Sequence, residues 1–354
     1  MAASDPALRQ QEARQRRVMD SPRFRDGQFR NTHDVGMLKN PMTFSMATDF
    51  ALGGASRRPP HTLPVIADTL ARLARPPETG LRVTWLSHST VLIELDGVRL
   101  LTDPVWGNRA SPLSFAGPLR FHPMPLQLHE LGRIDAIVLS HDHYDHLCAE
   151  TWRRLARGAC PGWSGKVVTA LGMGAHLQAL GIAADQITEL DWGDGVRVGE
   201  VELVATPAQH FSGRGLTDRN HTLWMGVAML GPRHRVFFSG DTGPTDEHVD
   251  IGAALGPFDV VLFEIGAWHA AWGGIHLGPQ AAFDTFARMR ARTLLPVHWS
   301  TFDLGLHPWE QPGEDLYQLA QANGASVWFP QLGQPLEVGD VAFAPWWRAV
   351  VGTR

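Results

Sequence analysis

The chain has 354 residues, which is enough for one large domain or two ordinary ones. Hydrophobic residues make up 44% and charged residues 19%, as in a globular protein with a sizeable core. The net charge of −5, from 31 basic and 36 acidic residues, gives no indication of nucleic acid as a partner. No apolar run is long enough to span a membrane, and no apolar stretch follows the N-terminal arginines, so we expect a soluble, cytoplasmic protein.

The chain contains only two cysteines, Cys148 and Cys160. One disulfide between them is an open alternative, but two cysteines do not make a disulfide framework. A reducing compartment is therefore the expected setting. The 13 tryptophans and 25 prolines are more than usual, and most of them are expected to fill the core or to stiffen loops.

Residues 1–80 are expected to form an N-terminal extension that wraps the main domain. The first 30 residues are polar, with seven arginines against four acidic residues, and their start is predicted to be flexible. The rest, at 31–80, is rich in loops, with one predicted helix over 64–73. An apolar-rich stretch in this region fits either a core or an apolar entrance for a lipid, and it consists of Met37, Leu38, Met42, Phe44 and Met46.

The main domain is expected over 81–354, where predicted strands and helices mix without strict alternation. Asp96-Gly97 is a two-residue hairpin turn between predicted strands. Pro279 suits the first turn of a helix over 280–290. Sheets with helices on their outer faces fit this mixture best, so the predicted fold class is α/β. The other predicted strands are 83–86, 90–95, 98–101, 134–139, 166–169, 186–190, 196–198, 201–206, 222–230, 235–239, 260–264, 294–297 and 327–329, and the other helices are 150–156, 173–180 and 314–322.

A run of metal-ligand residues follows the predicted strand at 134–139. It extends from Ser140 to His146 and contains three histidines and two aspartates in the pattern H-x-H-x-D-H. Such side chains are poor material for a core, because each would need a buried partner. Imidazole suits Zn, Fe or Ni, and a carboxylate oxygen can complete or bridge a metal site. The run therefore predicts a metal site, in preference to a polar loop with chance histidines.

Three more candidate ligands follow later predicted strands. His210 comes shortly after the strand at 201–206, Asp241 follows Gly240, and His298 directly follows Val297. A glycine before Asp241 lets the backbone approach closely. Each residue alone is more often a hydrogen-bonded histidine or a turn aspartate, so these assignments depend on the histidine run.

Short motifs across 81–319 accompany these candidate ligands. They are W-L-S-H-S-T-V-L at 85–92, L-T-D-P at 101–104, S-P at 111–112, G-P at 117–118, the histidine run at 140–147, E-L-D-W at 189–192, T-P-A-Q-H at 206–210, F-F-S-G-D-T-G at 237–243, G-P-F-D at 256–259, I-G-A at 265–267 and H-W-S-T-F at 298–302. The histidine run resembles the metallo-β-lactamase superfamily. The whole set resembles its N-acyl-phosphatidylethanolamine-hydrolysing phospholipase D branch, with the bacterial relatives.

The resemblance implies an αββα sandwich of two mixed sheets with helices on the outer faces. It also implies two metal ions at one edge, with Zn²⁺ expected first and Fe or Mn as alternatives. Asp145 is expected both to bind metal and to steer the proton of the nucleophile. The resemblance assigns His141, His143 and His210 to the first metal and Asp145, His146 and His298 to the second, with Asp241 and a hydroxide bridging the two.

Other polar residues are candidates for supporting roles. Asp103 is expected to accept the second N–H of a metal-bound imidazole, with a turn cap before Pro104 as the alternative. The resemblance implies that His276 faces the metals and protonates a leaving group or helps to bind phosphate, with a helix cap as the alternative. His88 is expected to pack or to support a ligand, and His307 is expected at the surface.

The segment 266–274 joins a predicted strand to His276 and contains glycines and two tryptophans. This composition suits either a mobile lid over a pocket or ordinary packing.

Together these features predict a di-zinc phosphodiesterase of the phospholipase D type. A lactonase or other acyl-ester hydrolase on the same metals is the alternative reaction, and a non-catalytic binding module is the alternative class. The complete set of seven ligand positions argues against the binding module. The expected substrate is a small molecule or a lipid, with a peripheral membrane contact and a homodimer as further expectations.

Overall fold

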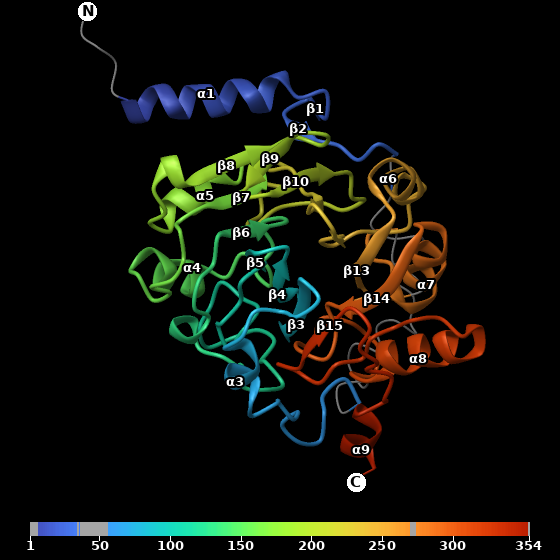
Figure 1. Cartoon of the computed structure of the whole chain (residues 1–354). Helices are drawn as coiled ribbons and strands as arrows, with labels where there is room; N and C mark the ends of the chain where they lie inside the picture. The colour runs from blue at the N-terminus through green and yellow to red at the C-terminus, as the bar shows by residue number, and fades with distance from the viewer. Residues whose placement is uncertain (1–5, 34, 36–55, 270–273, 353–354) are drawn as a thin grey trace, which may run out of the picture.

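Two mixed β-sheets form the centre of the molecule (Figure 1). This computed structural model describes residues 6–33, 35, 56–269 and 274–352. Side chains from both sheets belong to one hydrophobic core, in which Trp85, Phe237 and Phe263 are almost completely buried. The core therefore lies between the sheets and holds them together through apolar burial.

The seven-stranded sheet has an antiparallel and a parallel part. In sheet order its strands are β15 (Pro335–Glu337), β3 (Leu81–Ser87), β4 (Thr90–Leu95), β5 (Val98–Thr102), β6 (Ala136–Leu139), β7 (Val167–Ala170) and β8 (Ile187–Leu190). The pairs from β15 to β5 are antiparallel, and those from β5 to β8 are parallel. Asp96 and Gly97 have positive φ angles of 48° and 86°, which confirms the predicted two-residue hairpin turn between β4 and β5.

The six-stranded sheet is also mixed. In sheet order its strands are β14 (Ala291–Val297), β13 (Phe258–Glu264), β12 (Arg235–Phe238), β11 (Gly226–Leu230), β10 (Val201–Thr206) and β9 (Gly195–Val198). The strands β12, β13 and β14 are parallel, and the other neighbours are antiparallel. All but one residue of β13 are buried, as expected for a parallel strand that is covered on both faces.

Helices lie on both sides of the pair of sheets (Figure 1). They are α1 (Pro6–Asp20), α3 (Thr69–Leu73), α4 (Ala149–Ala156), α5 (Gly174–Ala179), α6 (Glu247–Leu255), α7 (Gly278–Arg288), α8 (Gln311–Asn323) and α9 (Trp347–Val351). The helix α5 contacts β8 of one sheet, and α7 contacts β13 and β14 of the other. This arrangement confirms the predicted α/β fold with two mixed sheets and outer helices. Short segments complete the chain: the hairpin β1 (Phe24–Arg25) and β2 (Gln28–Phe29), and the 3₁₀ turns Leu128–Glu130 and Ala184–Gln186.

Two predicted elements are smaller than expected. The predicted strand at 327–329 contributes only an isolated bridge from Val327 to β14. The predicted helix over 64–73 is confined to α3, because Val65 instead forms a bridge with Leu332. In both places the backbone pairs with a distant segment, and the predicted strand or helix is shorter than the local sequence pattern indicates.

Several observed elements were not predicted, namely α1, α6, α9 and β15. The helix α1 is polar at most positions and lacks the apolar stripe that reveals a surface helix. The helix α6 contains Gly252, which lowers helix propensity in a sequence-based reading. The same glycine lets the helix approach the backbone of Met289 so closely that a Cβ atom would not fit.

The structure also bears on the predictions for the cysteines and for a membrane-spanning helix. Cys148 and Cys160 are both free and buried, so the alternative of a disulfide between them is wrong. The apolar-rich stretch at 37–46 lies outside the described residues. Within the described ranges, no helix has the length and apolar character needed to cross a membrane.

The strand ends bring the candidate site together at one edge of the sandwich. The strands β6, β10, β12 and β14 are each followed within a few residues by a candidate ligand, and β13 ends at Glu264. Asp241, after β12, contacts the histidines that follow β6, β10 and β14. Glu264 contacts His276. The turn between β3 and β4 lies at the same edge, because the His298 N–H donates to the carbonyl of His88, 3.0 Å away. Ligand side chains far apart in the chain thus meet in space.

Candidate metal centre

The seven predicted ligands form two clusters that share one carboxylate. In the first cluster the ligand atoms lie within 4.8 Å of one another, and its members are His141, His143, His210 and Asp241. The second cluster satisfies the same limit and consists of Asp145, His146 and His298, joined by His88. Asp241 links them, because its Oδ1 lies 3.1 Å from His146 Nε2 and its Oδ2 lies 3.1 Å from His298 Nε2.

The histidine run serves both clusters because it turns sharply after β6. The backbone N–H groups of His146 and Leu147 both donate to the carbonyl of His143, over 3.0 Å and 2.7 Å. This turn places His141 and His143 in the first cluster and Asp145 and His146 in the second. The predicted division of the run between two metals matches this geometry.

The backbone is strained at several site residues. His88, Asp103 and His298 have positive φ angles of 40°, 33° and 64°, a region that non-glycine residues seldom adopt. Each such residue costs about 1–3 kcal/mol and persists only where its surroundings hold it in place. The Trp85 indole N–H and the His298 backbone N–H both donate to the His88 carbonyl, which fixes this turn.

Hydrogen bonds outside the clusters orient the imidazoles. Asp103 Oδ2 accepts from His146 Nδ1 over 2.6 Å, and Asp103 also accepts from the N–H and hydroxyl of Ser140. The structure therefore places Asp103 in the supporting position that the sequence predicted. The His210 Nδ1–H donates to the carbonyl of Ile275 over 2.9 Å, which leaves its Nε2 directed at the cluster.

Unpartnered buried atoms test whether the residues fit metal ions. His146 uses Nδ1 to bind Asp103, which leaves Nε2 for a partner inside the cluster. That atom faces Asp241 Oδ1 at 3.1 Å, and neither atom has a hydrogen-bond partner. A metal ion bound by this nitrogen and this oxygen would satisfy both buried atoms. The imidazole and carboxylate donor set suits Zn, Fe or Mn, and the residues therefore fit a metal site.

Donor spacing in the first cluster is consistent with the same conclusion. His143 Nδ1 lies 2.9 Å from His141 Nε2 and 3.2 Å from His210 Nε2. Asp241 Oδ2 lies 3.7 Å from the Nε2 atoms of both His141 and His210. Donors at about 2.0–2.1 Å from a tetrahedral ion are separated by about 3.3–3.4 Å, which falls within this range.

The two clusters differ in how they shift histidine pKa values. In the first cluster, burial and neighbouring histidines hold the pKa of His141 well below its usual range, and burial also lowers that of His210. In the second cluster burial by itself would lower the pKa of His298, but Asp241 and Asp145 raise it to about 10. The pKa of Asp241 is well below its usual range because His146 and His298 outweigh its burial. The shared site is thus an ionised carboxylate that attracts positive charge.

His276 lies beside the metal ligands and is held by Glu264. The His276 Nδ1–H donates to Glu264 Oε2 over 2.6 Å, and the ring centres of His210 and His298 lie 5.1 Å and 5.5 Å from that of His276. Glu264 is completely buried at the end of β13 and also accepts the backbone N–H of Thr242. Sequence reasoning missed Glu264, although a carboxylate that ends an apolar strand was a usable signal.

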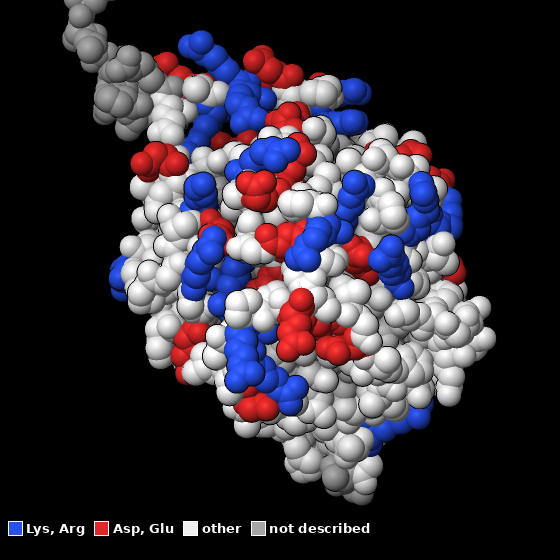
Figure 2. Space-filling view, in the orientation of Figure 1, with Lys and Arg blue, Asp and Glu red and all other residues white. Residues whose placement is uncertain are grey.

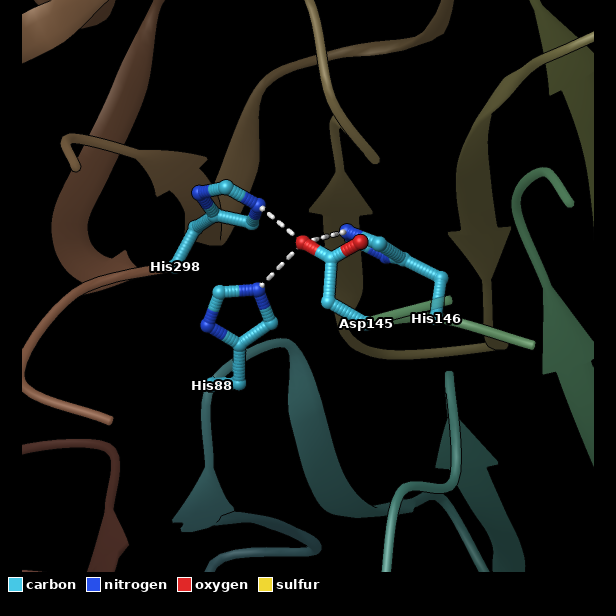
Figure 3. A group of neighbouring side chains, drawn as sticks. All are labelled: His88, Asp145, His146 and His298. Atoms are coloured by element: carbon cyan, nitrogen blue, oxygen red, sulfur yellow. Dashed lines mark hydrogen bonds and ion pairs between the residues drawn. The ribbon is translucent and has the colours of Figure 1, made fainter. Parts of the chain in front are cut away.

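His88 lies beside the ligands, in agreement with the predicted packing or supporting role. Its Nε2 lies 3.0 Å from Asp145 Oδ2, on which His298 and His146 also converge (Figure 3). Burial and the nearby His298 lower the pKa of His88 to about 3, so this ring is neutral. A neutral His88 donates its Nε2–H to Asp145 and so supports that carboxylate.

The segment 266–274, for which a mobile lid and ordinary packing are the alternatives, is only partly described, because residues 270–273 lie outside the described ranges. Trp268 lies against the start of α7 at Gly278. His307 belongs to neither of the two clusters, as expected, but it is only partly at the surface. Its ring is half-buried and stacks on Trp268 with 6.4 Å between ring centres, and its Nδ1 contacts the carbonyl of Pro308.

The fold and the histidine–aspartate site define a metal-dependent hydrolase. The family model described as "Beta-lactamase superfamily domain" matches residues 98–299, and the chain belongs to the metallo-β-lactamase superfamily. It is 41% identical over 334 residues to an uncharacterized protein of Mycobacterium tuberculosis, a match that covers 93% of this chain and 88% of that protein.

Two further comparisons connect the chain to named proteins. It is 41% identical over 256 residues to N-acyl-phosphatidylethanolamine-hydrolyzing phospholipase D 1 of Caenorhabditis elegans, a match that covers 69% of this chain and 71% of that protein. Among solved structures, isothiocyanate hydrolase from Delia radicum gut bacteria superposes with a TM-score of 0.58 at 17% identity, over 73% of this chain and all of that chain. The structural match supports the fold alone.

Proposed function

We propose that this protein is a di-zinc phosphodiesterase of the phospholipase D type, which hydrolyses a phospholipid or a related phosphodiester. The observation that carries the proposal is the position of Asp241 between the clusters, with one oxygen toward His146 and the other toward His298, His141 and His210. A shared carboxylate suits two ions about 3.5–4 Å apart, the arrangement that phosphatases and nucleases use for in-line displacement. Similarity to the Caenorhabditis elegans phospholipase supports the substrate class.

The donor set supports zinc as the first choice of metal. It consists of five histidines and two aspartates, and iron or manganese would also accept these ligands. When bound, two such ions would lower the pKa of a water molecule between them and neutralise charge on the phosphoryl oxygens.

Asp145 is proposed to guide the proton of the attacking water. Its carboxylate holds the N–H of His88 on Oδ2, and 13% of the side chain remains exposed at the mouth of the site. Burial by itself would raise the pKa of Asp145, but His146 and the hydrogen bonds from His298 and His88 hold it well below the usual range. The carboxylate is therefore ionised and can accept a hydrogen bond from water.

His276 is proposed to protonate the leaving group. Glu264 holds its Nδ1–H, so Nε2 is the ring atom that would exchange a proton with the substrate. In the reaction, the water oxygen forms a bond to phosphorus and the ester P–O bond breaks. The departing alkoxide takes a proton from His276, and the products are an alcohol and a phosphomonoester.

The proposed partner is a lipid or another small molecule. Basic and acidic side chains are interspersed on the face shown in Figure 2, which gives no support for a nucleic-acid surface. A peripheral membrane contact, a homodimer and a cytoplasmic location stay predictions.

The proposal is tested with purified protein loaded with two zinc equivalents. N-acyl-phosphatidylethanolamine and bis(p-nitrophenyl) phosphate are compared with a panel of lactones under the same conditions. We expect phosphodiester turnover, and with the lipid a phosphatidic acid and an N-acylethanolamine as products. Lactone hydrolysis without phosphodiester turnover would favour the acyl-ester alternative. Failure to bind two metals per chain would favour the binding module.

A further inference from the structure

An N-terminal segment, Pro6 to Thr32, reaches the first metal cluster from outside the main domain. We call this segment the N-terminal arm. It consists of α1, the hairpin β1–β2 and the residues that follow, and it lies across the end of the sandwich near β9 and β10 (Figure 1). Its last hydrogen bonds within the described residues involve Asn31 and Thr32.

Asn31 pairs with both backbone groups of the metal ligand His210. The Asn31 Nδ2–H donates to the His210 carbonyl over 2.8 Å, and the His210 N–H donates to Asn31 Oδ1 over 3.0 Å. One carboxamide thus satisfies the donor and the acceptor of a single buried residue, as a neighbouring strand would. The pairing holds the His210 backbone in place relative to the arm.

This backbone contact adds to the fixation of the His210 imidazole. The ring is bound at Nδ1 by the carbonyl of Ile275, and the Asn31 carboxamide binds the backbone of the same residue. His210 belongs to the irregular connection 207–225 between β10 and β11. The Gln209 backbone is held by Thr242 and Gly243, and Asn31 holds the next residue, His210. Asn31 therefore supplies a constraint that the sheet provides for ligands directly after strand ends.

The arm is anchored well enough to act as a support. Arg14 Nε lies 3.2 Å from a carboxylate oxygen of Glu189, and Arg17 donates to the Glu189 carbonyl over 2.6 Å. Figure 2 shows Lys and Arg side chains gathered along α1 with acidic side chains among them. Phe29 is completely buried, and its N–H donates to the Asn220 carbonyl in the same connection that carries His210.

From these contacts we propose that Asn31 is a positioning residue for His210, and that the N-terminal arm is a working part of the first metal cluster. The arm binds the main domain through α1 and Phe29 and presents the Asn31 carboxamide to the His210 backbone. Loss of that carboxamide would let Nε2 of His210 move relative to His141 and His143. The first of the two metal ions should then bind more weakly, while the second should not.

The test measures stepwise zinc affinity by competition with a chromogenic chelator. The full-length wild type is compared with Asn31→Ala, Asn31→Asp and His210→Ala. Because outer contacts of metal ligands typically contribute about 10–100-fold in affinity, we expect Asn31→Ala to weaken one binding step about 10-fold or more. That step should be the one that His210→Ala abolishes, and the other step should change by less than about 2-fold.

Thr32→Ala is the matched control. Thr32 lies next to Asn31, and its hydroxyl donates to Glu247 at the surface, without a contact to His210 in the described hydrogen bonds. This variant should keep both zinc affinities, which would show that an altered arm does not in general weaken the site.

Folding is measured separately by thermal unfolding of the metal-free proteins. Asn31→Ala leaves the buried N–H and carbonyl of His210 without these partners, so in chelator it should melt somewhat below the wild type but still cooperatively. Asn31→Asp keeps the size and the acceptor for the His210 N–H but loses the donor, and it should weaken the same binding step. Unchanged stepwise affinities in a folded Asn31 variant would overturn the proposal. Recovery of activity at saturating zinc would support it, since a merely unfolded protein would not recover.

Discussion

The two metal clusters use different means to hold their histidines. In the first, the partners of the imidazoles outside the cluster are neutral: the Ser140 hydroxyl at His141 and the Ile275 carbonyl at His210. In the second, a carboxylate stands behind the ligand, because Asp103 binds His146. The carboxylates raise the pKa values of His146 and His298 in the second cluster, whereas burial lowers those of His141 and His210 in the first.

The two clusters should therefore bind a metal ion through different interactions, charge in the second and accurate geometry in the first. The second cluster carries an excess of negative charge, which attracts a cation strongly at low dielectric. In the first cluster Asp241 is the one carboxylate among three histidines. Metal binding there should depend more on accurate placement of neutral imidazoles. Substitutions of charge should therefore damage the second cluster more, and substitutions that loosen geometry should damage the first more.

The largest expected effect is from Asp241→Asn, which acts on both clusters. The amide keeps the size of the side chain but removes the charge that faces His146 and His298. Because metal ions supply several kcal/mol of transition-state stabilisation, we expect kcat/KM to fall about 1,000-fold or more. Elemental analysis should show fewer than two metals per chain. Retention of two tightly bound metals would contradict the central place of this carboxylate.

The next effect is from His276→Ala, which should leave both clusters loaded. A lost general acid typically costs about 100-fold or more in kcat. We expect that loss with both zinc ions retained, and a smaller loss for a substrate whose leaving group needs no proton, such as p-nitrophenolate. A variant that loses metal instead of rate would assign His276 to the ligands.

Much of this arrangement was predictable from the chain. The histidine run follows an apolar strand, and His210, Asp241 and His298 follow later strands, so the local pattern offered these residues as candidates. The resemblance then grouped seven of them as ligands, and the structure brings these seven residues together in the two clusters. The hairpin at Asp96-Gly97 was predictable for the same reason, since two residues dictate the turn. Local signals of this kind identify what lies at a strand end.

The supporting residues depend on contacts between distant segments and were harder to predict. Asn31 and His210 are far apart in the chain, and nothing in the polar arm indicates that one carboxamide meets one ligand. The position of Glu264 at the end of an apolar strand was visible in the sequence, but its partner His276 could be identified only in the structure. The polar helix α1 was missed because Arg14 holds it through an ion pair with Glu189, without an apolar stripe.

Asp103→Asn and Ser140→Ala test the two clusters against each other. Asp103→Asn removes the charge behind His146 and should weaken one zinc-binding step about 10–100-fold. Ser140→Ala removes a neutral hydroxyl that contacts both His141 and Asp103, and it should have a smaller effect, mainly on the step that involves His141. Stepwise zinc titration of both variants provides the measurement. Equal losses would show that charge does not distinguish the clusters.

The smallest effect concerns His248, a buried histidine away from both clusters. Its ring packs against Phe237 and Phe263, and burial lowers its pKa to about 4. The unfolded chain binds a proton at this histidine near pH 6.5, but the folded protein does not until about pH 4. Stability is therefore lost as the pH falls from about 6.5 toward 4, by about 2 kcal/mol at pH 5.

His248→Leu isolates this contribution, because the metal ligands titrate equally in both proteins. Urea unfolding at pH 7 and pH 5 gives the loss of unfolding free energy for each protein, and the wild type should lose about 2 kcal/mol more than the variant. Identical losses would mean that the folded protein accepts a proton on His248 without cost. His248 would then be protonated in the folded protein although no carboxylate binds it. In that case burial alone could not explain the low pKa values of the histidines in the first cluster.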